Sequence, residues 1–108
     1  MPEGDGPVAR LAELEIDPDR LDAYRRHLRE KVEASVAAEP GVLALHAVAL
    51  PGRPASIRLL EVYASPDAYE AHLRSPHFLR YKALTEGMVL SLRLIEADPV
   101  VLRGKPLG

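Results

Sequence analysis

Apolar residues recur along the chain with two different periods, and these periods predict its secondary structure. Apolar residues at every second position are typical of half-buried strands, and spacings of three and four are typical of helices. The alternating or continuous apolar pattern predicts strands over residues 8–16, 42–50, 57–63 and 89–97. The helical spacing predicts one long helix over residues 18–39 and two short helices over residues 66–74 and 76–86.

Breakers and capping residues mark where these helices begin and end. The pairs at residues 17–18, 65–66 and 75–76 each join a side chain that can cap a helix to a proline suited to the first helical position. The Pro-Gly pair at residues 40–41 ends the long helix. The segment PGRPAS, residues 51–56, is rich in breakers and is therefore expected to be a turn between two strands.

The long helix has one apolar face. Its members, at spacings of three and four, are Leu21, Tyr24, Leu28, Val32 and Val36. We expect this face to pack on the sheet and the charged side chains to face water.

The predicted order of strands and helices is β-α-β-β-α-β, which is typical of the ferredoxin-like α+β fold. This fold contains a four-stranded antiparallel sheet with helices packed on one face. We expect a flexible lead over residues 1–7, a single domain over residues 8–97 and a tail over residues 98–108. The tail contains Val-Val-Leu, from which we predict a short edge strand in contact with a partner protomer.

The second and fourth strands are apolar on both sides of the pleat. In the second strand, Leu43 and Leu45 are expected on one face, with Val42 and Ala44 on the other. Helices on one side of the sheet would leave the second apolar face in water, and a large exposed apolar patch usually marks an interaction surface. We therefore expect a homodimer in which two sheets pack face to face.

The composition limits the classes of function that the chain can have. With 108 residues, a net charge of -2 and scattered basic residues, the sequence indicates one domain and no nucleic-acid partner. No apolar run approaches the roughly 20 residues that a membrane span requires. Cysteine is absent, which excludes disulfides and thiolate catalysis, and we expect a cytoplasmic location.

His72 and Glu61 are the main candidates for chemistry. At about 100° per helical residue, His72 falls within the apolar arc of its helix, so its imidazole is expected to point at the sheet. Glu61 shares a strand face with Leu59 and Tyr63, which predicts an inward carboxylate. A buried imidazole needs a hydrogen-bond partner, and Glu61 is the natural one. This pair either satisfies the core or acts as an acid and base in a pocket.

Three tyrosines and two histidines are further candidates for binding a substrate. Tyr24, Tyr63 and Tyr81 combine an apolar ring with a polar hydroxyl, which suits a pocket for planar ligands as well as ordinary core packing. His77 lies in the first turn of the last helix and is expected at the rim of a pocket. His46 is expected to line either a pocket or the dimer interface.

Motifs for bound cofactors and metals are absent from the sequence. It has no glycine-rich phosphate loop, no HExxH or similar ligand spacing, and no GxSxG nucleophile motif. A metal site assembled from His46, Glu61 and His72 stays open, but no ligand spacing supports it. We therefore expect no cofactor and no metal.

Two runs of the sequence resemble the antibiotic biosynthesis monooxygenase family: EPGVLALHAV (residues 39–48) and IRLLEVYASPDAYEAHLRSPHF (residues 57–78). The likeness lies in a helix that ends in Pro-Gly, then Glu61 and Tyr63 one residue apart, then the inward His72 and the Ser-Pro-His-Phe run. The resemblance implies a dimeric α+β barrel. It also implies a cofactor-free monooxygenase that oxidises a small aromatic or quinol-type substrate with O2.

By the same resemblance, His72 and Glu61 would form an acid/base pair, and Tyr63 and Tyr81 would line the pocket. The chain departs from the family in two respects: Tyr63 stands where many relatives have Trp, and the first strand has no Asn. Haem-degrading relatives rely on such residues, so haem oxygenation is disfavoured. Two other functions stay open: a non-catalytic small-molecule-binding or structural dimer, and an isomerase on the same fold.

Overall fold

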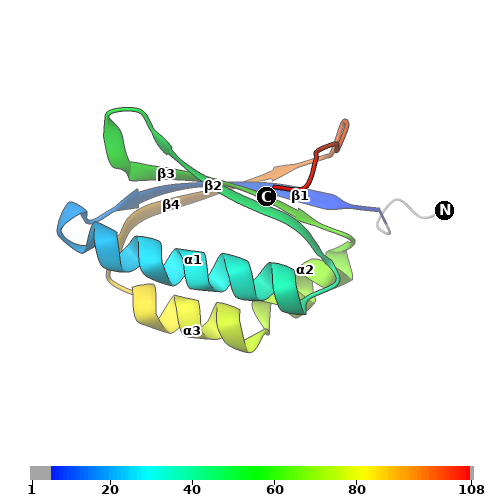
Figure 1. The fold of residues 1–108 in the computed structure, drawn as a ribbon, viewed down its shortest axis with the longest axis horizontal. Helices are drawn as coiled ribbons and strands as arrows, with labels where there is room; N and C mark the ends of the chain where they lie inside the picture. Colours follow the sequence, from blue (N-terminus) through cyan, green and yellow to red (C-terminus); the bar gives the residue numbers. More distant parts are fainter. Residues whose placement is uncertain (1–5, 108) are drawn as a thin grey trace.

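Helices cover one face of a four-stranded antiparallel sheet in the computed structural model, which describes residues 6–107 (Figure 1). The elements in chain order are β1 (Val8–Ile16), the short 3-10 helix η2 (Pro18–Arg20), α1 (Leu21–Ala38), β2 (Val42–Leu50), β3 (Arg53–Tyr63), α2 (Pro66–Leu73), α3 (Pro76–Thr85) and β4 (Val89–Ala97). This order confirms the predicted α+β, ferredoxin-like fold class, with two short helices before the last strand. Residues 1–5 of the predicted flexible lead lie outside the described residues.

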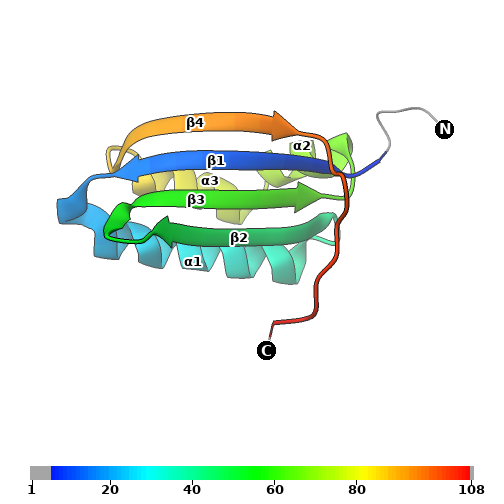
Figure 2. The ribbon, with the colours of Figure 1, turned by 90° about the horizontal axis from the view of Figure 1, so that it is seen from above.

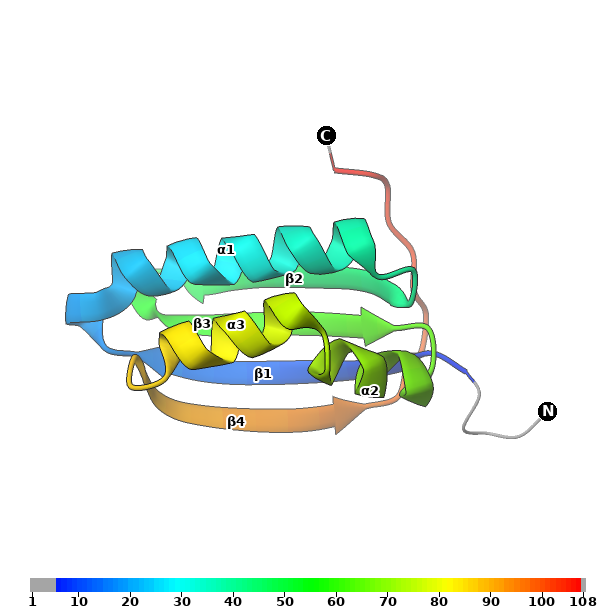
Figure 3. The same ribbon diagram turned by 90° about the horizontal axis from the view of Figure 1, so that it is seen from below.

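The sheet has the strand order β2-β3-β1-β4, so β2 and β4 are its edges. Seen from the helix side, α1 lies along β2, while α2 and α3 lie toward the middle of the sheet (Figure 3). No described helix lies over β4, and Leu92 and Leu94 on its inner face are 48% and 50% exposed. Among the described helices, none has the length and apolarity that a membrane crossing requires.

The hairpin between β2 and β3 is tighter than predicted. β3 begins at Arg53 rather than at residue 57, and only a Pro-Gly pair separates the strands. Gly52 has a φ of 73°, a left-handed conformation that glycine adopts without steric cost. Pro54 is tolerated within β3 because β1 pairs with β3 only as far as Ser56, so the missing N–H leaves no β1 carbonyl unpaired.

A bulge near the start of β2 changes which side chains face the helices. The register of β2 against β3 shifts between Val42 and Ala44, which leaves Leu43 as an extra residue. Val42 and Leu45 are buried, whereas Leu43 is 51% exposed. The prediction that Leu43 and Leu45 share a face is therefore wrong, because the bulge breaks the period of two.

The buried face of α1 includes polar residues that the apolar pattern did not predict. Its buried side chains are Tyr24, Leu28, Lys31 and Ser35, whereas Val36 is 51% exposed. Spacings of four, three and four keep the buried residues on one line of a helix with 3.6 residues per turn, and Val36 is rotated about 100° from Ser35. The predicted stripe is wrong at its C-terminal end, and Lys31 lies in the interior.

Serine caps position α2 and α3, as predicted. Ser65 Oγ accepts a hydrogen bond from the N–H of Ala68 at 3.0 Å, and Ser75 Oγ accepts one from the N–H of Phe78 at 3.3 Å. Ser75 Oγ also donates to the carbonyl oxygen of His72 at 2.7 Å. One side chain therefore ends α2 and begins α3, so the chain turns sharply just after His72.

The face of the sheet away from the helices divides into an apolar row and a charged row. Cross-strand pairing places His46, Leu60, Leu11 and Ile95 in one row, and Val48, Arg58, Glu13 and Arg93 in the next. In the charged row, Glu13 lies 3.6 Å from both Arg58 and Arg93. The outer face is therefore only partly the apolar surface that the sequence predicted.

The C-terminal segment, residues 98–107, crosses the outer face at one end of the sheet (Figure 2). Ala9 and Val62 lie on this face and are buried, at 6% and 4% exposure. The segment forms no strand within this chain, so the edge strand predicted there stays a prediction that requires a partner protomer.

Gly41 permits a close contact between the start of β2 and α2. A Cβ atom built there would lie 2.5 Å from the Cβ of Ala68. We expect Gly41→Ala to lower the free energy of unfolding by about 1–3 kcal/mol, because the two segments must move apart. Urea denaturation measures this change. Gly104→Ala is the matched control, since no atom of the described residues lies within 4 Å of its added Cβ. Equal effects of both substitutions would contradict the prediction.

Candidate functional site

A cavity of about 730 Å³ lies between the inner face of the sheet and helices α2 and α3. This volume is typical of a site for a small organic molecule. Its polar and aromatic walls include Arg10, Lys31, Glu61, Tyr69, His72 and Tyr81. The cavity is open along β4, where the half-exposed Leu92 and Leu94 line it.

The structure brings only part of the predicted site into this cavity. His72, Glu61 and Tyr81 line it. The predicted residues outside its lining are Tyr24, Tyr63, His77 and His46. Tyr24 and Tyr63 are fully buried in the core, and His46 is exposed on the outer face of the sheet.

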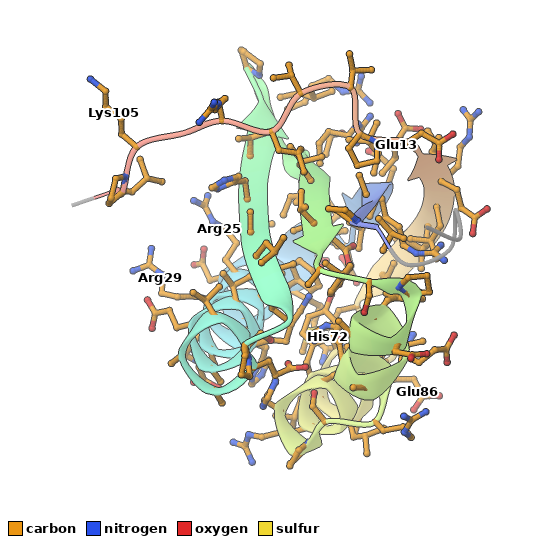
Figure 4. The ribbon with its side chains drawn as sticks, turned by 90° about the vertical axis from the view of Figure 1, so that its right-hand side faces the viewer. Glu13, Arg25, Arg29, His72, Glu86 and Lys105 are labelled. Atoms are coloured by element: carbon orange, nitrogen blue, oxygen red, sulfur yellow. The ribbon has the colours of Figure 1, made fainter. Side chains whose placement is uncertain are left out.

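His72 points into the interior beside α1, and its side chain is 1% exposed, as its helical phase predicted (Figure 4). Its Nδ1 atom lies 2.9 Å from Oε2 of Glu39, the residue that follows the last turn of α1. The prediction that Glu61 is the hydrogen-bond partner of His72 is therefore wrong. The C-terminal end of α1 faces α2, which puts Glu39 on the ring's Nδ1 side, whereas Glu61 is bonded within its own strand.

His77 shares the same carboxylate oxygen. Its Nε2 atom lies 2.5 Å from Oε2 of Glu39, and its side chain is 17% exposed. His77 is partly exposed, as expected of a rim residue, but it does not line this cavity. Glu39 holds it against the end of α2. The three possible ligand atoms of Glu39, His72 and His77 lie within 4.8 Å of one another, so among the described residues they could hold a metal ion.

The protonation of Glu39 determines which ring nitrogens carry protons. Burial raises the pKa of Glu39, but the hydrogen bonds and charges of His72 and His77 outweigh burial, so this pKa lies below its ordinary value. An ionised carboxylate only accepts hydrogen bonds, so Nδ1 of His72 and Nε2 of His77 must both donate. A neutral His72 then has a free lone pair on Nε2, which is buried and has no partner among the described residues. Such a nitrogen is equipped to accept a proton from a ligand.

Glu61 is held by Tyr63 rather than by a histidine. The hydroxyl of Tyr63 donates to Oε1 of Glu61 at 2.5 Å. Burial, followed by the charge of Glu61, raises the pKa of Tyr63 far above its ordinary value, so this phenol stays protonated at neutral pH. Tyr63 therefore orients the Glu61 carboxylate at the cavity wall without lining the cavity itself.

Tyr81 reaches the cavity from α3 and is paired with Tyr24 behind it. Their hydroxyl oxygens are 2.6 Å apart. Burial raises the pKa of Tyr81, although its hydrogen bonds with Tyr24 and Thr85 partly oppose this. Tyr24 thus supports the cavity wall from the core and is not placed to contact a ligand.

Lys31 is a cavity residue that the sequence interpretation missed. It is 4% exposed, lines the cavity and makes no ion pair with residues 6–107. Burial lowers the pKa of its ammonium, and the charges of Glu61 and Glu39 partly offset this effect. Its Nζ atom lies 4.8 Å from the ring centroid of Tyr81. The sequence does contain a signal for it, because Lys31 lies three residues after Leu28 and four before Ser35, and so falls on the buried face of α1. A search for apolar residues alone does not find it, because lysine is charged.

Aromatic side chains form much of the remaining wall. Phe78 packs beside His72 with ring centroids 5.1 Å apart. The guanidinium of Arg10 lies 4.0 Å from the ring centroid of Tyr69 and bonds to Glu96 at 3.0 Å. The site therefore combines flat apolar surfaces with one buried base, one buried cation and one oriented carboxylate.

The sequence model of the antibiotic biosynthesis monooxygenase family matches residues 7–84. The chain belongs to this family. A candidate antibiotic biosynthesis monooxygenase from Bacteroides thetaiotaomicron is 43% identical to this family member, with a TM-score of 0.90 over 94% of this chain and 99% of that chain. The family resemblance drawn from the sequence is thus confirmed.

More distant structures share the fold of this family member. A candidate monooxygenase from Lactobacillus acidophilus is 28% identical, with a TM-score of 0.83 over 85% of this chain and 44% of that chain. A candidate antibiotic biosynthesis monooxygenase from Caulobacter crescentus is 21% identical, with a TM-score of 0.85 over 91% of this chain and 93% of that chain, a likeness that shows the fold alone. No protein with a curated function matches the chain.

The lowered pKa of Glu39 predicts a pH-dependent contribution to stability. A carboxylate with a depressed pKa stabilises the folded state above its unfolded pKa and loses this effect as the pH falls through the folded value. We expect Glu39→Gln to lower the free energy of unfolding by about 1–3 kcal/mol at pH 7, since two hydrogen bonds lose their charged acceptor. The difference from wild type should shrink below about pH 4. Denaturation at several pH values measures it.

Glu33→Gln is the matched control for this prediction. Glu33 is exposed on α1 and makes no ion pair with the described residues, so we expect a change within about 0.5 kcal/mol. A Glu39→Gln defect that is independent of pH between neutral and acid would contradict the assignment of an ionised Glu39.

Proposed function

We propose that this family member is a monooxygenase that oxidises a small phenolic or quinol-type molecule with O2 and without a bound cofactor. The observation that carries the proposal is Nε2 of His72, which has no hydrogen-bond partner within residues 6–107 and belongs to a side chain that lines the cavity. Glu39 holds the opposite ring nitrogen, as carboxylates do for many catalytic histidines. The hydroxyl of a bound phenol is a suitable proton donor to Nε2.

Deprotonation makes such a phenol reactive toward O2 itself. His72 Nε2 takes the hydroxyl proton, and the phenolate carries electron density onto its ring carbons. A ring carbon that bears hydrogen forms a C–O bond with O2, and the reduced dioxygen takes up the proton to become a hydroperoxide. Loss of the ring hydrogen as a proton, with cleavage of the O–O bond, releases water and leaves a quinone. The substrate supplies all the electrons, so no outside reductant is required.

Lys31 favours a substrate that becomes negatively charged during this reaction. Its ammonium is buried at the cavity wall without an ion pair among the described residues. In a site of low polarity, a fixed positive charge stabilises a phenolate and the reduced dioxygen more than it would in water. The oriented Glu61 carboxylate can accept a hydrogen bond from a second hydroxyl, while Tyr69 and Phe78 offer flat surfaces to the ring.

Oxygen uptake with a panel of phenols and hydroquinones tests the proposal. We expect substrate-dependent consumption of O2 by the wild-type protein, and a kcat that is lower by about 100-fold or more in His72→Gln, because the general base is lost. We expect Lys31→Met to lower kcat about tenfold, because the negative charge that develops during the reaction loses its charged partner. The same substitution should raise the free energy of unfolding, because an unpaired charge leaves the interior.

Glu33→Gln serves again as the control, since Glu33 lies outside the cavity lining. Equal rates in wild type and His72→Gln would overturn the role of His72. Ligands that raise the melting temperature without any oxygen uptake would favour a binding protein. Conversion of a substrate without consumption of O2 would favour an isomerase.

We also propose that the protein is a homodimer joined through the outer face of the sheet, with residues 98–108 against the partner protomer. Support comes from Leu11 and Leu60, which lie opposite each other across β1 and β3 and are each 40% exposed. The tail adds Val100 and Val101 at 98% and 74% exposure. The apolar row lies next to the charged row, so a second copy can bury the apolar residues and form ion pairs with the charged ones.

Sedimentation equilibrium tests the dimer. We expect wild type to be dimeric at micromolar concentration and Leu60→Glu to be monomeric, because a buried unpaired carboxylate opposes association. Leu79→Glu is the control, since Leu79 is 55% exposed on α3, on the opposite side of the sheet. A wild-type monomer at this concentration would refute the proposed assembly.

A further inference from the structure

Glu39, His72 and His77 meet at one point from three separate helical segments. Glu39 follows α1, His72 lies in the last turn of α2, and His77 lies in the first turn of α3. Two imidazole nitrogens approach the same carboxylate oxygen, at 2.9 and 2.5 Å. We propose that these residues form a site for a divalent transition-metal ion, with Zn²⁺ as the simplest occupant, and that its binding switches off His72 as a base.

The chemistry of the three ligands selects the class of ion. Two imidazole nitrogens and one carboxylate oxygen suit Zn²⁺, Co²⁺ or Fe²⁺, whereas Ca²⁺ and Mg²⁺ prefer oxygen alone. Bonds of about 2.0–2.1 Å to a tetrahedral ion separate ligand atoms by about 3.4 Å. The present separations from Glu39 Oε2, 2.9 and 2.5 Å, therefore need to open by less than about 1 Å. The ligand atoms of His72 and His77 lie within 4.8 Å of each other, so small rotations of these two side chains and of Glu39 would complete the geometry.

The surroundings allow an ion to enter and then hold its ligands. The side chains of Glu39 and His77 are 15% and 17% exposed, so the site reaches the surface, whereas His72 is 1% exposed. The ring of His72 is fixed between Tyr63 and Phe78, with centroid distances of 5.4 and 5.1 Å. Three protein ligands leave one position of a tetrahedral ion open to water.

Metal binding changes the tautomer of His72. A metal ion bonds to the lone pair of a deprotonated Nδ1, so the proton now on Nδ1 moves to Nε2 of the same neutral ring. Nε2 then carries the proton and can no longer accept one. This consequence rests on the proposed function, because there Nε2 is the base that deprotonates the substrate. Bound Zn²⁺ is thus an inhibitor of the cofactor-free reaction and takes no part in it.

Calorimetric titration of metal-free protein with Zn²⁺ tests the site without reference to activity. We expect one ion to bind per chain, and Glu39→Gln and His77→Asn each to weaken binding by at least about tenfold. The intense visible absorption of four-coordinate Co²⁺ should appear in wild type and be lost in both variants. His46→Asn is the matched control, because His46 is exposed on the outer face of the sheet. If no Zn²⁺ binds, or if all four proteins bind it with equal affinity, the proposal of a metal site is wrong. The three residues would then serve only as a hydrogen-bonded link between the helices.

Nitrogen-15 NMR of the histidine rings tests the switch. We expect Nε2 of His72 to change from an unprotonated to a protonated signal when Zn²⁺ is added to wild type, and not in His77→Asn. An unchanged ring signal in saturated protein would overturn the switch while leaving the site. If a phenol is oxidised, Zn²⁺ should stop that reaction in wild type far more than in His77→Asn. If none is oxidised, the proposed function fails, and the titration and the ring signal still decide the inference.

Discussion

The carboxylate of Glu39 is the interaction on which the arrangement of the site depends. Its Oε2 atom accepts hydrogen bonds from His72 and His77, and in doing so it ties the end of α1 to the junction of α2 and α3. The Ser75 cap makes that junction sharp enough for both imidazoles to reach one oxygen. A single acceptor therefore fixes the helices and the proton positions of two rings at once.

The interior beside this carboxylate contains charge where a simple core would be apolar. Lys31 and Glu61 both line the cavity, and neither makes an ion pair with another of residues 6–107. Buried charges of this kind lower the stability of a fold unless a ligand or a specific contact uses them. Both charges lie at the wall of a cavity of about 730 Å³. This arrangement indicates a role in binding a ligand rather than in packing the core.

Most of the fold could be predicted from the sequence, because strands and caps are local patterns. The alternation in β1 and the serine-proline starts of α2 and α3 depend only on nearby residues. The pairing of Glu39 with His72 could not be predicted, since 33 residues separate them and only the packing of α1 on α2 brings them together. Lys31 was missed for a different reason. The buried face of α1 was predicted from apolar residues alone, and Lys31 lies on that face although it is charged. The bulge at Leu43 has no signal in the residue types around it.

The uncovered strand β4 separates the part of the cavity that determines ligand size and shape from the part that holds the base. Leu92 and Leu94 border the cavity from an edge that no described helix covers, whereas His72 and its partner are anchored among the helices. Substitutions along this edge can change the size and shape of the ligand that fits without moving the base. Selectivity can therefore diverge among descendants of this chain by mutation of a single strand, while the reactive centre is inherited intact.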